Sequence, residues 1–372
     1  MEKVMLVAAR KEIADVTPYV AGKPIEEVQR ELKLDRVIKL ASNENPYGCS
    51  RLATEAVERE LSQISLYPEA SGPMLLQKLA NRFGLESGNV ILGAGSDELI
   101  RLLTRAFNST GDEAIMADVT FPRYETNVTI EGGVPVTIPL IEGVHNLEGM
   151  LAAVTEKTKI MFVCNPNNPT GTIVGKAALL AFIENVPKHI MIVVDEAYCE
   201  YVEDSEYLDT VPLLSEFPNL VILRTFSKIY GLAALRVGYA LAHPTIVRNL
   251  HKVRDSFNTS RLSQAAALAA LDDEDFVTTC RQKNKTERAY LQNELDAAGL
   301  RYFPSHGNFI MVHFPDHTGD DIFQRLLRQG IIVRPGNLLG YPQTVRVTIG
   351  DSEQNQAFIA ALRNILNGND QQ

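Results

Sequence analysis

The chain has 372 residues, of which 45% are hydrophobic and 22% are charged, and this supplies enough apolar material for a sizeable core and more than one domain. Its 36 lysines and arginines stand against 46 aspartates and glutamates, so the formal net charge is −10. Nucleic acid and anionic lipid surfaces repel such a chain at long range, and any anionic ligand must be held by a local site.

The N-terminal region and the cysteines point to an ordinary soluble protein. The apolar run at residues 4–9 is too short to span a membrane and has no small-residue cleavage site after it. The four cysteines form no C-x-x-C pair, so neither a zinc site nor a disulfide framework is indicated. We therefore expect a cytoplasmic protein that binds no metal, no membrane and no nucleic acid.

From about residue 90, short β-branched runs alternate with longer segments of helical period. This pattern is typical of a mostly parallel sheet with helices on its faces. Several of the runs are apolar on both faces, as buried strands are. We predict an α/β fold with a large domain at residues 43–255. Its strands are expected at residues 90–92, 113–117, 135–139, 159–163, 191–194, 220–225 and 238–241.

After about residue 254 the pattern changes to that of a smaller α+β domain. We expect residues 1–42 to form an N-terminal arm and to join residues 256–372 in this second unit. The sequence predicts an alanine-rich helix at 264–271, a charged helix at 275–298, a strand at 308–314, a helix at 320–329, and short strands near 331–334 and 345–349.

The first segment that could carry chemistry is GAGSDE at residues 93–98, which follows a predicted strand and begins a helical stretch. Free N–H groups at a helix start form a phosphate site. Glu98 takes the place of the third glycine of a dinucleotide fingerprint. On its own, the segment is more simply explained by Ser96 acting as a helix N-cap.

Two further segments lie at the ends of predicted strands. NPNNPTG at residues 165–171 is a rigid loop at the edge where open α/β sheets bind ligands, although a tight turn is the simpler explanation of this segment alone. Asp195 ends the apolar run at residues 192–194. A buried aspartate is costly unless it meets a cation or several donors, and capping of the next helix is an equally good explanation here.

The fourth segment, RTFSK at residues 224–228, ends another strand, and Arg236 follows eight residues after Lys228. Most lysines are simply solvated. Hydroxyls and a guanidinium around one amine, however, describe a site that holds a phosphate and a Schiff base together.

In this order the four segments resemble those of the fold type I aminotransferases, which use pyridoxal 5'-phosphate, and the resemblance extends over almost the whole chain. Three more runs narrow it to the histidinol-phosphate aminotransferases. These runs are TPYVAGKPI at residues 17–25, NENPYG at residues 43–48 and GIIVR at residues 330–334.

The resemblance implies how the cofactor ring is held. Lys228 would form the Schiff base and then act as general base and acid. Asp195 would pair with the pyridine nitrogen and keep it protonated, so that the ring accepts electrons. Tyr198 and Asn168 would donate to the ring oxygen, and Phe121 would stack on the ring where the family often has tyrosine.

The resemblance also implies a phosphate site shared between two subunits. Tyr67 would reach the phosphate from the partner, which makes a homodimer part of the active site. The remaining phosphate residues are Ser96 and Asp97 through their backbone N–H groups, Ser227 and Arg236 through their side chains, and Thr225 as a weaker candidate.

Substrate recognition is expected from the smaller unit and the arm. Arg346 matches the arginine that binds the α-carboxylate of amino-acid substrates, and a guanidinium suits carboxylate or phosphate. Arg334 and Tyr19 resemble the partners of the substrate phosphate, and Asn308 and Asn45 line the same site. A surface salt bridge is the alternative role for Arg334.

The implied reaction is an exchange in two half-reactions between glutamate and imidazole-acetol phosphate. An aromatic amino acid aminotransferase, alone or as a second activity, is the main alternative. A threonine-phosphate decarboxylase has similar motifs. A doubly wound nucleotide-binding protein would leave Lys228, Asp195 and Asn168 unexplained. A binding or regulatory protein without turnover also stays open.

Overall fold

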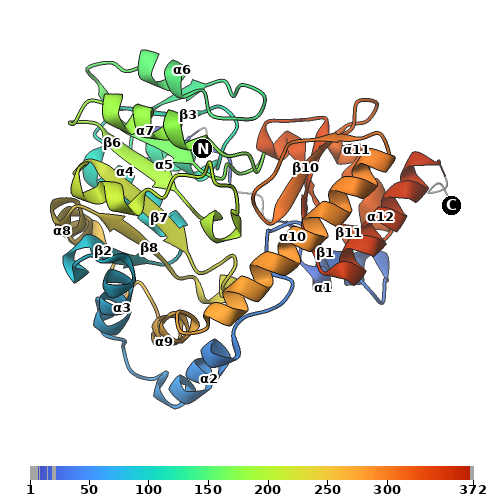
Figure 1. Ribbon diagram of the computed structural model, residues 1–372, viewed down its shortest axis with the longest axis horizontal. Coiled ribbons are helices and arrows are strands. Elements are labelled where there is room, and N and C mark those ends of the chain that lie inside the picture. Colours follow the sequence, from blue (N-terminus) through green and yellow to red (C-terminus); the bar gives the residue numbers. More distant parts are fainter. Residues whose placement is uncertain (1–6, 8, 15, 19–21, 369–372) are drawn as a thin grey trace, which may run out of the picture.

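The protein forms two bodies joined by a long helix (Figure 1). The structure is a computed structural model that describes residues 7, 9–14, 16–18 and 22–368. The larger body contains a seven-stranded sheet, and the smaller one contains a four-stranded and a two-stranded sheet. Within the described part of the chain, no helix combines the length and the apolarity that a membrane crossing needs.

The seven-stranded sheet confirms the predicted strands, whose ends differ by no more than one residue. The strand order is β2-β8-β7-β6-β5-β3-β4. Only β8 is antiparallel to its neighbours, so the sheet is mostly parallel as expected. The strands are β2 (Val90–Gly93), β3 (Glu113–Ala117), β4 (Val134–Ile138), β5 (Thr158–Cys164), β6 (Met191–Asp195), β7 (Leu220–Thr225) and β8 (Gly238–Ala242).

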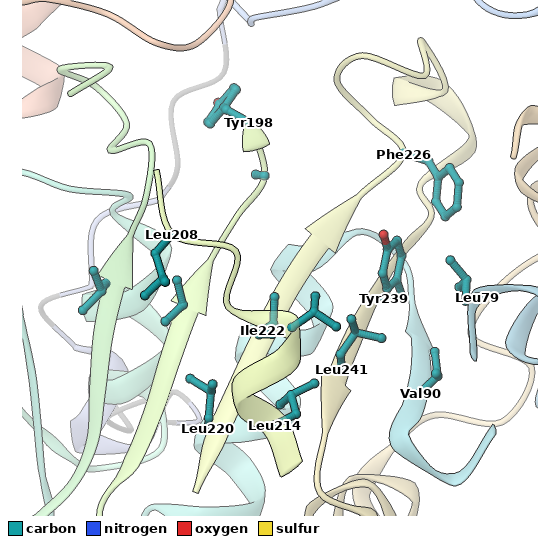
Figure 2. Packing of buried hydrophobic residues seen from close by; sticks show 14 of the residues in the cluster. Leu79, Val90, Tyr198, Leu208, Leu214, Leu220, Ile222, Phe226, Tyr239 and Leu241 are labelled. Atoms are coloured by element: carbon teal, nitrogen blue, oxygen red, sulfur yellow. The ribbon is translucent and has the colours of Figure 1, made fainter. Parts of the chain in front are cut away.

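Helices cover both faces of this sheet because its strands are apolar on both sides. Successive side chains along a strand point to opposite faces, so Val90 and Leu92 enter one core cluster and Ile91 enters the other. Figure 2 shows part of the first cluster, where Ile222 of β7 lies beside Leu241 of β8, its partner in the strand register. The first cluster includes side chains of α3 (Pro73–Phe83), α6 (Leu147–Ala152) and α7 (Lys176–Asn185), and the second those of α4 (Ser96–Phe107), α5 (Arg123–Ile130) and α8 (Pro244–Val253).

The smaller body packs its sheet against three helices. Its four-stranded sheet is antiparallel and has the order β12-β13-β10-β9. The predicted strand near residues 331–334 divides at Val333 into β11 and β12, which belong to different sheets. The elements are β9 (Arg301–Tyr302), β10 (Phe309–His313), β11 (Ile331–Ile332), β12 (Arg334–Pro335), β13 (Thr344–Thr348), α10 (Glu274–Ala297), α11 (Gly319–Arg328) and α12 (Ser352–Leu366).

The segment before residue 43 joins the two bodies. Strand β1 (Ile38–Lys39) pairs in parallel with β11, and the Leu40 carbonyl then accepts a hydrogen bond of 2.8 Å from the Thr348 N–H. Two residues are too few for a periodic pattern, so β1 was not predicted. Helix α1 (Ile25–Leu32) precedes it. The short 3₁₀ helices in the described residues are η1 (Lys11–Ile13), η2 (Leu61–Gln63), η3 (Ser87–Asn89), η4 (Cys199–Tyr201), η5 (Val211–Ser215), η6 (Ala233–Leu235) and η7 (Gly336–Leu339).

The alanine-rich helix α9 (Arg261–Ala270) rests on the larger body. Ala266 and Ala267 lie in the first core cluster together with Ala53 of α2 (Arg51–Glu60). Small side chains on both helices allow α2 and α9 to approach closely. The division into a large domain at 43–255 and a second unit at 1–42 and 256–372 stays a prediction, and α9 shows that side chains beyond residue 255 also complete the larger core.

Candidate active site

A cavity of about 170 Å³ lies beside the carboxyl ends of β5, β6 and β7. Eleven residues named from the sequence line it, and they come from six separate stretches of the larger body and from β13 of the smaller body. They are Ser96, Asp97, Phe121, Asn168, Asp195, Tyr198, Thr225, Ser227, Lys228, Arg236 and Arg346. Parallel strands end at one edge of the sheet, and this brings together the segments that follow them.

Lys228 follows β7 and points its amine into this cavity. Its Nζ donates to the Ser42 carbonyl at 3.3 Å and lies 5.6 Å from the centre of the Tyr198 ring. Desolvation, with repulsion from Arg346 and Arg236, lowers the pKa of this amine to about 8. Near neutral pH a useful fraction of the amine is therefore unprotonated, as attack on a carbonyl carbon requires.

Asp195 ends β6 and is buried. Its Oδ2 accepts a hydrogen bond of 2.7 Å from the Tyr124 hydroxyl, and its Oδ1 accepts one of 3.1 Å from the Ala197 N–H. Desolvation raises the pKa of the carboxyl group to about 6, although these hydrogen bonds oppose the shift. A cation facing Asp195 from the cavity would stabilise the carboxylate, and a protonated pyridine nitrogen is such a cation.

Tyr124 is a buried contact of this site that was not inferred from the sequence. Its ring stacks on Phe162 of β5 with 4.6 Å between the ring centres. It lies three residues after Phe121, whose ring meets it edge-on at 5.7 Å. Phe121 precedes Pro122, the N-cap of α5, and Tyr124 lies in the first turn of that helix, so the available signal was only a second aromatic residue three positions after Phe121.

A chain of polar contacts links the two bodies across the cavity. Arg346 of β13 donates to Asn168 Oδ1 at 2.6 Å and to the Ala41 carbonyl at 2.8 Å. Asn168 in turn donates to the Tyr198 hydroxyl at 3.4 Å, and Asn43 donates to the same oxygen at 3.0 Å. Asn43 lines the cavity as well, whereas Asn45 of the same motif, which was expected to line the substrate site, does not.

The opposite side of the cavity suits a phosphate group. Helix α4 begins there at Ser96, and Gly95 rather than Ser96 occupies the N-cap position. Arg236 donates to Ser227 Oγ at 3.2 Å and to the Ala94 carbonyl at 3.4 Å. Backbone N–H groups at a helix start, a hydroxyl and a guanidinium together match the oxygens of a phosphate.

Four residues that were named from the sequence and that the structure describes do not line this cavity. Arg334 lines a separate hollow of about 470 Å³ with Thr17, Pro18 and Arg123. Arg123 connects the two sites, because its Nε also donates to Asp97 Oδ1 at 2.8 Å.

The other three of these residues are Asn45, Asn308 and Tyr67. Asn45 donates to the Ile229 carbonyl at 2.7 Å, and Asn308 donates to the Asn43 carbonyl at 3.1 Å. Tyr67 is 77% exposed, and its ring stacks on Phe257 with centres 4.5 Å apart. Tyr19 falls outside the residues that the structure describes.

Comparisons with known proteins place these features in a family. The model of the class I and II aminotransferases matches residues 35–362. The histidinol-phosphate aminotransferase of Anoxybacillus flavithermus is 49% identical over 357 residues, which are 96% of each chain. That of Bacillus subtilis (strain 168) is 47% identical over 361 residues, 96% of this chain and 99% of the relative.

Solved structures agree with the sequence comparisons. A histidinol-phosphate aminotransferase from Sinorhizobium meliloti, solved in complex with pyridoxal-5'-phosphate, superposes with a TM-score of 0.90 at 28% identity and covers 98% of this chain and 99% of its own. The aspartate aminotransferase of Thermus thermophilus with maleate has the same fold, with a TM-score of 0.84 at 22% identity over 97% of this chain and 100% of its own.

Proposed function

The chain belongs to the class I and II aminotransferases and uses pyridoxal 5'-phosphate, and from this premise we propose that it interconverts histidinol phosphate and imidazole-acetol phosphate. Glutamate and 2-oxoglutarate are the other amino donor and acceptor. This is a step of histidine biosynthesis. The relatives of nearly half identical sequence carry the name of this activity over almost their full length, and this supports the substrate assignment.

The observation that carries the proposal is the meeting of Lys228 and Asp195 in one cavity with a phosphate site. The cofactor supplies an electrophilic carbon and a ring that accepts electrons. Lys228 is the amine that attaches to it covalently and, once displaced, carries a proton on Nζ. Asp195 holds the ring nitrogen protonated.

The other residues around the cavity position the cofactor. We assign Tyr198 and Asn168 to its ring oxygen, Phe121 to the face of the ring, and Arg236 to its phosphate. Ser96, Asp97, Thr225 and Ser227 complete the phosphate site. Each of these residues lines the cavity, and the assignments follow from the hydrogen-bond donors of the polar residues and from the aromatic ring of Phe121.

The residues that we assign to substrate binding lie in two places, the cavity and the neighbouring hollow. Arg346 faces the cavity from β13 and suits the α-carboxylate of glutamate. Arg334 and Arg123 line the neighbouring hollow, and their guanidinium groups suit the phosphate of the second substrate. The arm that contains Tyr19 would complete this end. Asn45 and Asn308 support the site through the contacts that they make with the segments around it.

A kinetic comparison tests the substrate assignment. With glutamate as donor, we expect kcat/KM to be higher for imidazole-acetol phosphate than for phenylpyruvate. Arg334→Ala should lower kcat/KM for the phosphorylated acceptor by about tenfold or more, and should affect glutamate less, because it removes a charge-assisted contact to phosphate. A preference for phenylpyruvate would make the protein an aromatic aminotransferase, and equal losses for both substrates would remove the role of Arg334.

We further propose that two copies of the chain form a homodimer in the cytoplasm. The stretch of chain around Tyr67 carries further exposed apolar side chains, namely Ile64 at 70%, Leu66 at 56% and Met74 at 68% exposure. Such a patch on one chain is typical of an interface. Because Tyr67 does not line the cavity of its own chain, it is available to reach that of a partner. The four cysteines are free thiols, which fits a reducing compartment.

A further inference from the structure

The hydroxyl of Tyr198 accepts hydrogen bonds from two amide groups. Tyr198 is 3% exposed and follows the end of β6 by three residues. Asn43 Nδ2 donates to its oxygen at 3.0 Å, and Asn168 Nδ2 donates to it at 3.4 Å. A hydroxyl has one proton and two acceptor sites, so the direction of both amides decides where the Tyr198 proton points.

The direction of the Asn168 amide is fixed by Arg346. The guanidinium of Arg346 donates to Asn168 Oδ1 at 2.6 Å. A guanidinium has no acceptor, so the oxygen of Asn168 must face Arg346. Its NH₂ group therefore faces Tyr198.

The direction of the Asn43 amide is fixed by Thr348. The backbone N–H of Asn43 donates to Thr348 Oγ1 at 2.9 Å. The proton of that hydroxyl is then donated to Asn43 Oδ1 at 3.2 Å. The oxygen of Asn43 therefore faces Thr348, and its NH₂ group faces Tyr198.

Both acceptor sites of the Tyr198 oxygen are thus in use, and its own proton must be donated in the remaining direction, toward the cavity that Tyr198 lines. We propose that Asn43 is a positioning residue that fixes the Tyr198 hydroxyl as a donor to the ring oxygen of the cofactor. This inference rests on the proposed function, in which the cofactor occupies the cavity with its ring oxygen at Tyr198.

The backbone at Asn43 is held in the conformation that this role needs. Its φ is 54°, in the left-handed region that asparagine enters more readily than most residues. Asn308 donates to its carbonyl at 3.1 Å, and the side chain is 1% exposed. Thr348 lies on β13 and Asn308 precedes β10, and both strands belong to the smaller body. The smaller body therefore sets, through Asn43, the direction in which the Tyr198 hydroxyl of the larger body donates.

The substitution Asn43→Asp tests this role with little change of shape. A carboxylate oxygen in place of NH₂ would accept the Tyr198 proton and turn it away from the cavity. A donor at the cofactor's ring oxygen stabilises the ionised ring oxygen, so its loss raises the pH midpoint of the bound cofactor's visible absorption change. We expect a rise of roughly half to one pH unit, the effect of one hydrogen bond on an ionisable group.

Control variants and melting temperatures distinguish a positioning role of Asn43 from the effect of the charge that Asn43→Asp adds and from a loss of stability. In a Tyr198→Phe background the effect of Asn43→Asp should shrink to that of the added charge alone, because no hydroxyl remains to be turned. Thr348→Val should raise the midpoint in the wild-type background, and Thr348→Ser, which keeps the hydroxyl, should not. The melting temperature of each cofactor-free variant reports any purely structural effect.

The possible results separate the role of Asn43 from the proposed function on which that role rests. An unchanged midpoint in Asn43→Asp, or an equal rise with and without the Tyr198 hydroxyl, would overturn the role of Asn43 while the protein still binds the cofactor and transaminates. Wild-type protein that develops no visible cofactor band would overturn both this role and the proposed function.

Discussion

At the scale of single residues, the chemistry depends on what burial does to two ionisable groups. Desolvation lowers the pKa of the Lys228 amine to about 8 and raises that of the Asp195 carboxyl to about 6. Both shifts have the same cause, since burial in the cavity disfavours the charged form of each group. A bound cofactor with a protonated ring nitrogen would stabilise the charged form of Asp195.

The pKa of Lys228 predicts how fast cofactor-free protein takes up pyridoxal 5'-phosphate. Only the unprotonated amine attacks, so the rate should rise tenfold per pH unit below about 8 and level off above it. Arg346→Gln should move this break to higher pH, because it removes a positive charge that lowers the pKa. The measurement is the visible absorption after mixing at a series of pH values. A rate still rising above pH 10 would show an ordinary lysine.

Tyr124 is expected to matter through Asp195. Tyr124→Phe keeps the ring that stacks on Phe162 and removes the hydrogen bond of 2.7 Å to Asp195 Oδ2. The pKa of Asp195 should rise further, because the lost donor stabilised its charged form. A hydrogen bond to a charged group contributes about 1.5–3 kcal/mol, so kcat should fall roughly tenfold or more. Steady-state kinetics at a pH below and a pH above 6 check this, and unchanged kcat at both would contradict it.

At the scale of elements, the start of α4 and the turn at Arg236 form the phosphate site together. Gly95 precedes α4 with a φ of 82°, and Arg236 follows η6 with a φ of 51°. A Cβ on Gly95 would lie 2.5 Å from Arg236 Nη2. The glycine thus admits the guanidinium to the helix start.

Gly95→Ala is therefore expected to weaken cofactor binding by about tenfold, since it displaces the guanidinium that faces the phosphate. Gly111→Ala is the matched control, because Gly111 has a φ of 87° and nothing within 4 Å of an added Cβ. Both variants should lose stability to backbone strain at a positive φ, on the order of 1–3 kcal/mol, which melting curves measure. Equal cofactor dissociation constants for the two variants would contradict this role of Gly95.

At the scale of the whole molecule, the active site would be shared between two chains. Tyr67 lies on the exposed apolar patch, while Lys228 lies in the cavity. In a homodimer, each site would combine Lys228 of one chain with Tyr67 of the other. A dimer can therefore be made in which one chain lacks Lys228 and the other lacks Tyr67.

Mixing variants tests this arrangement. Lys228→Ala alone should abolish transamination, and Tyr67→Ala alone should reduce it. After the two are unfolded and refolded together, mixed dimers contain one intact site each, so activity should return to about a quarter of the wild-type value. Lys228→Ala refolded with itself is the control. Activity no higher than the average of the two separate variants would mean that Tyr67 serves no partner.

The sequence by itself determined the sheet, because alternation and apolar runs report local burial. It also placed Lys228, Asp195 and Asn168 after strands, at the edge where a parallel sheet binds ligands. What it could not determine were contacts between distant segments, such as Asn43 with Tyr198, which are 155 positions apart.

Only the tertiary structure decided which residues of each motif face the cavity. It placed Asn43 rather than Asn45 on the lining, and it brought Arg346 from the smaller body to Asn168, 178 positions away. It also divided one predicted strand between two sheets at Val333. A periodic pattern states that a side chain is buried, but the neighbour against which it is buried depends on how the whole chain packs.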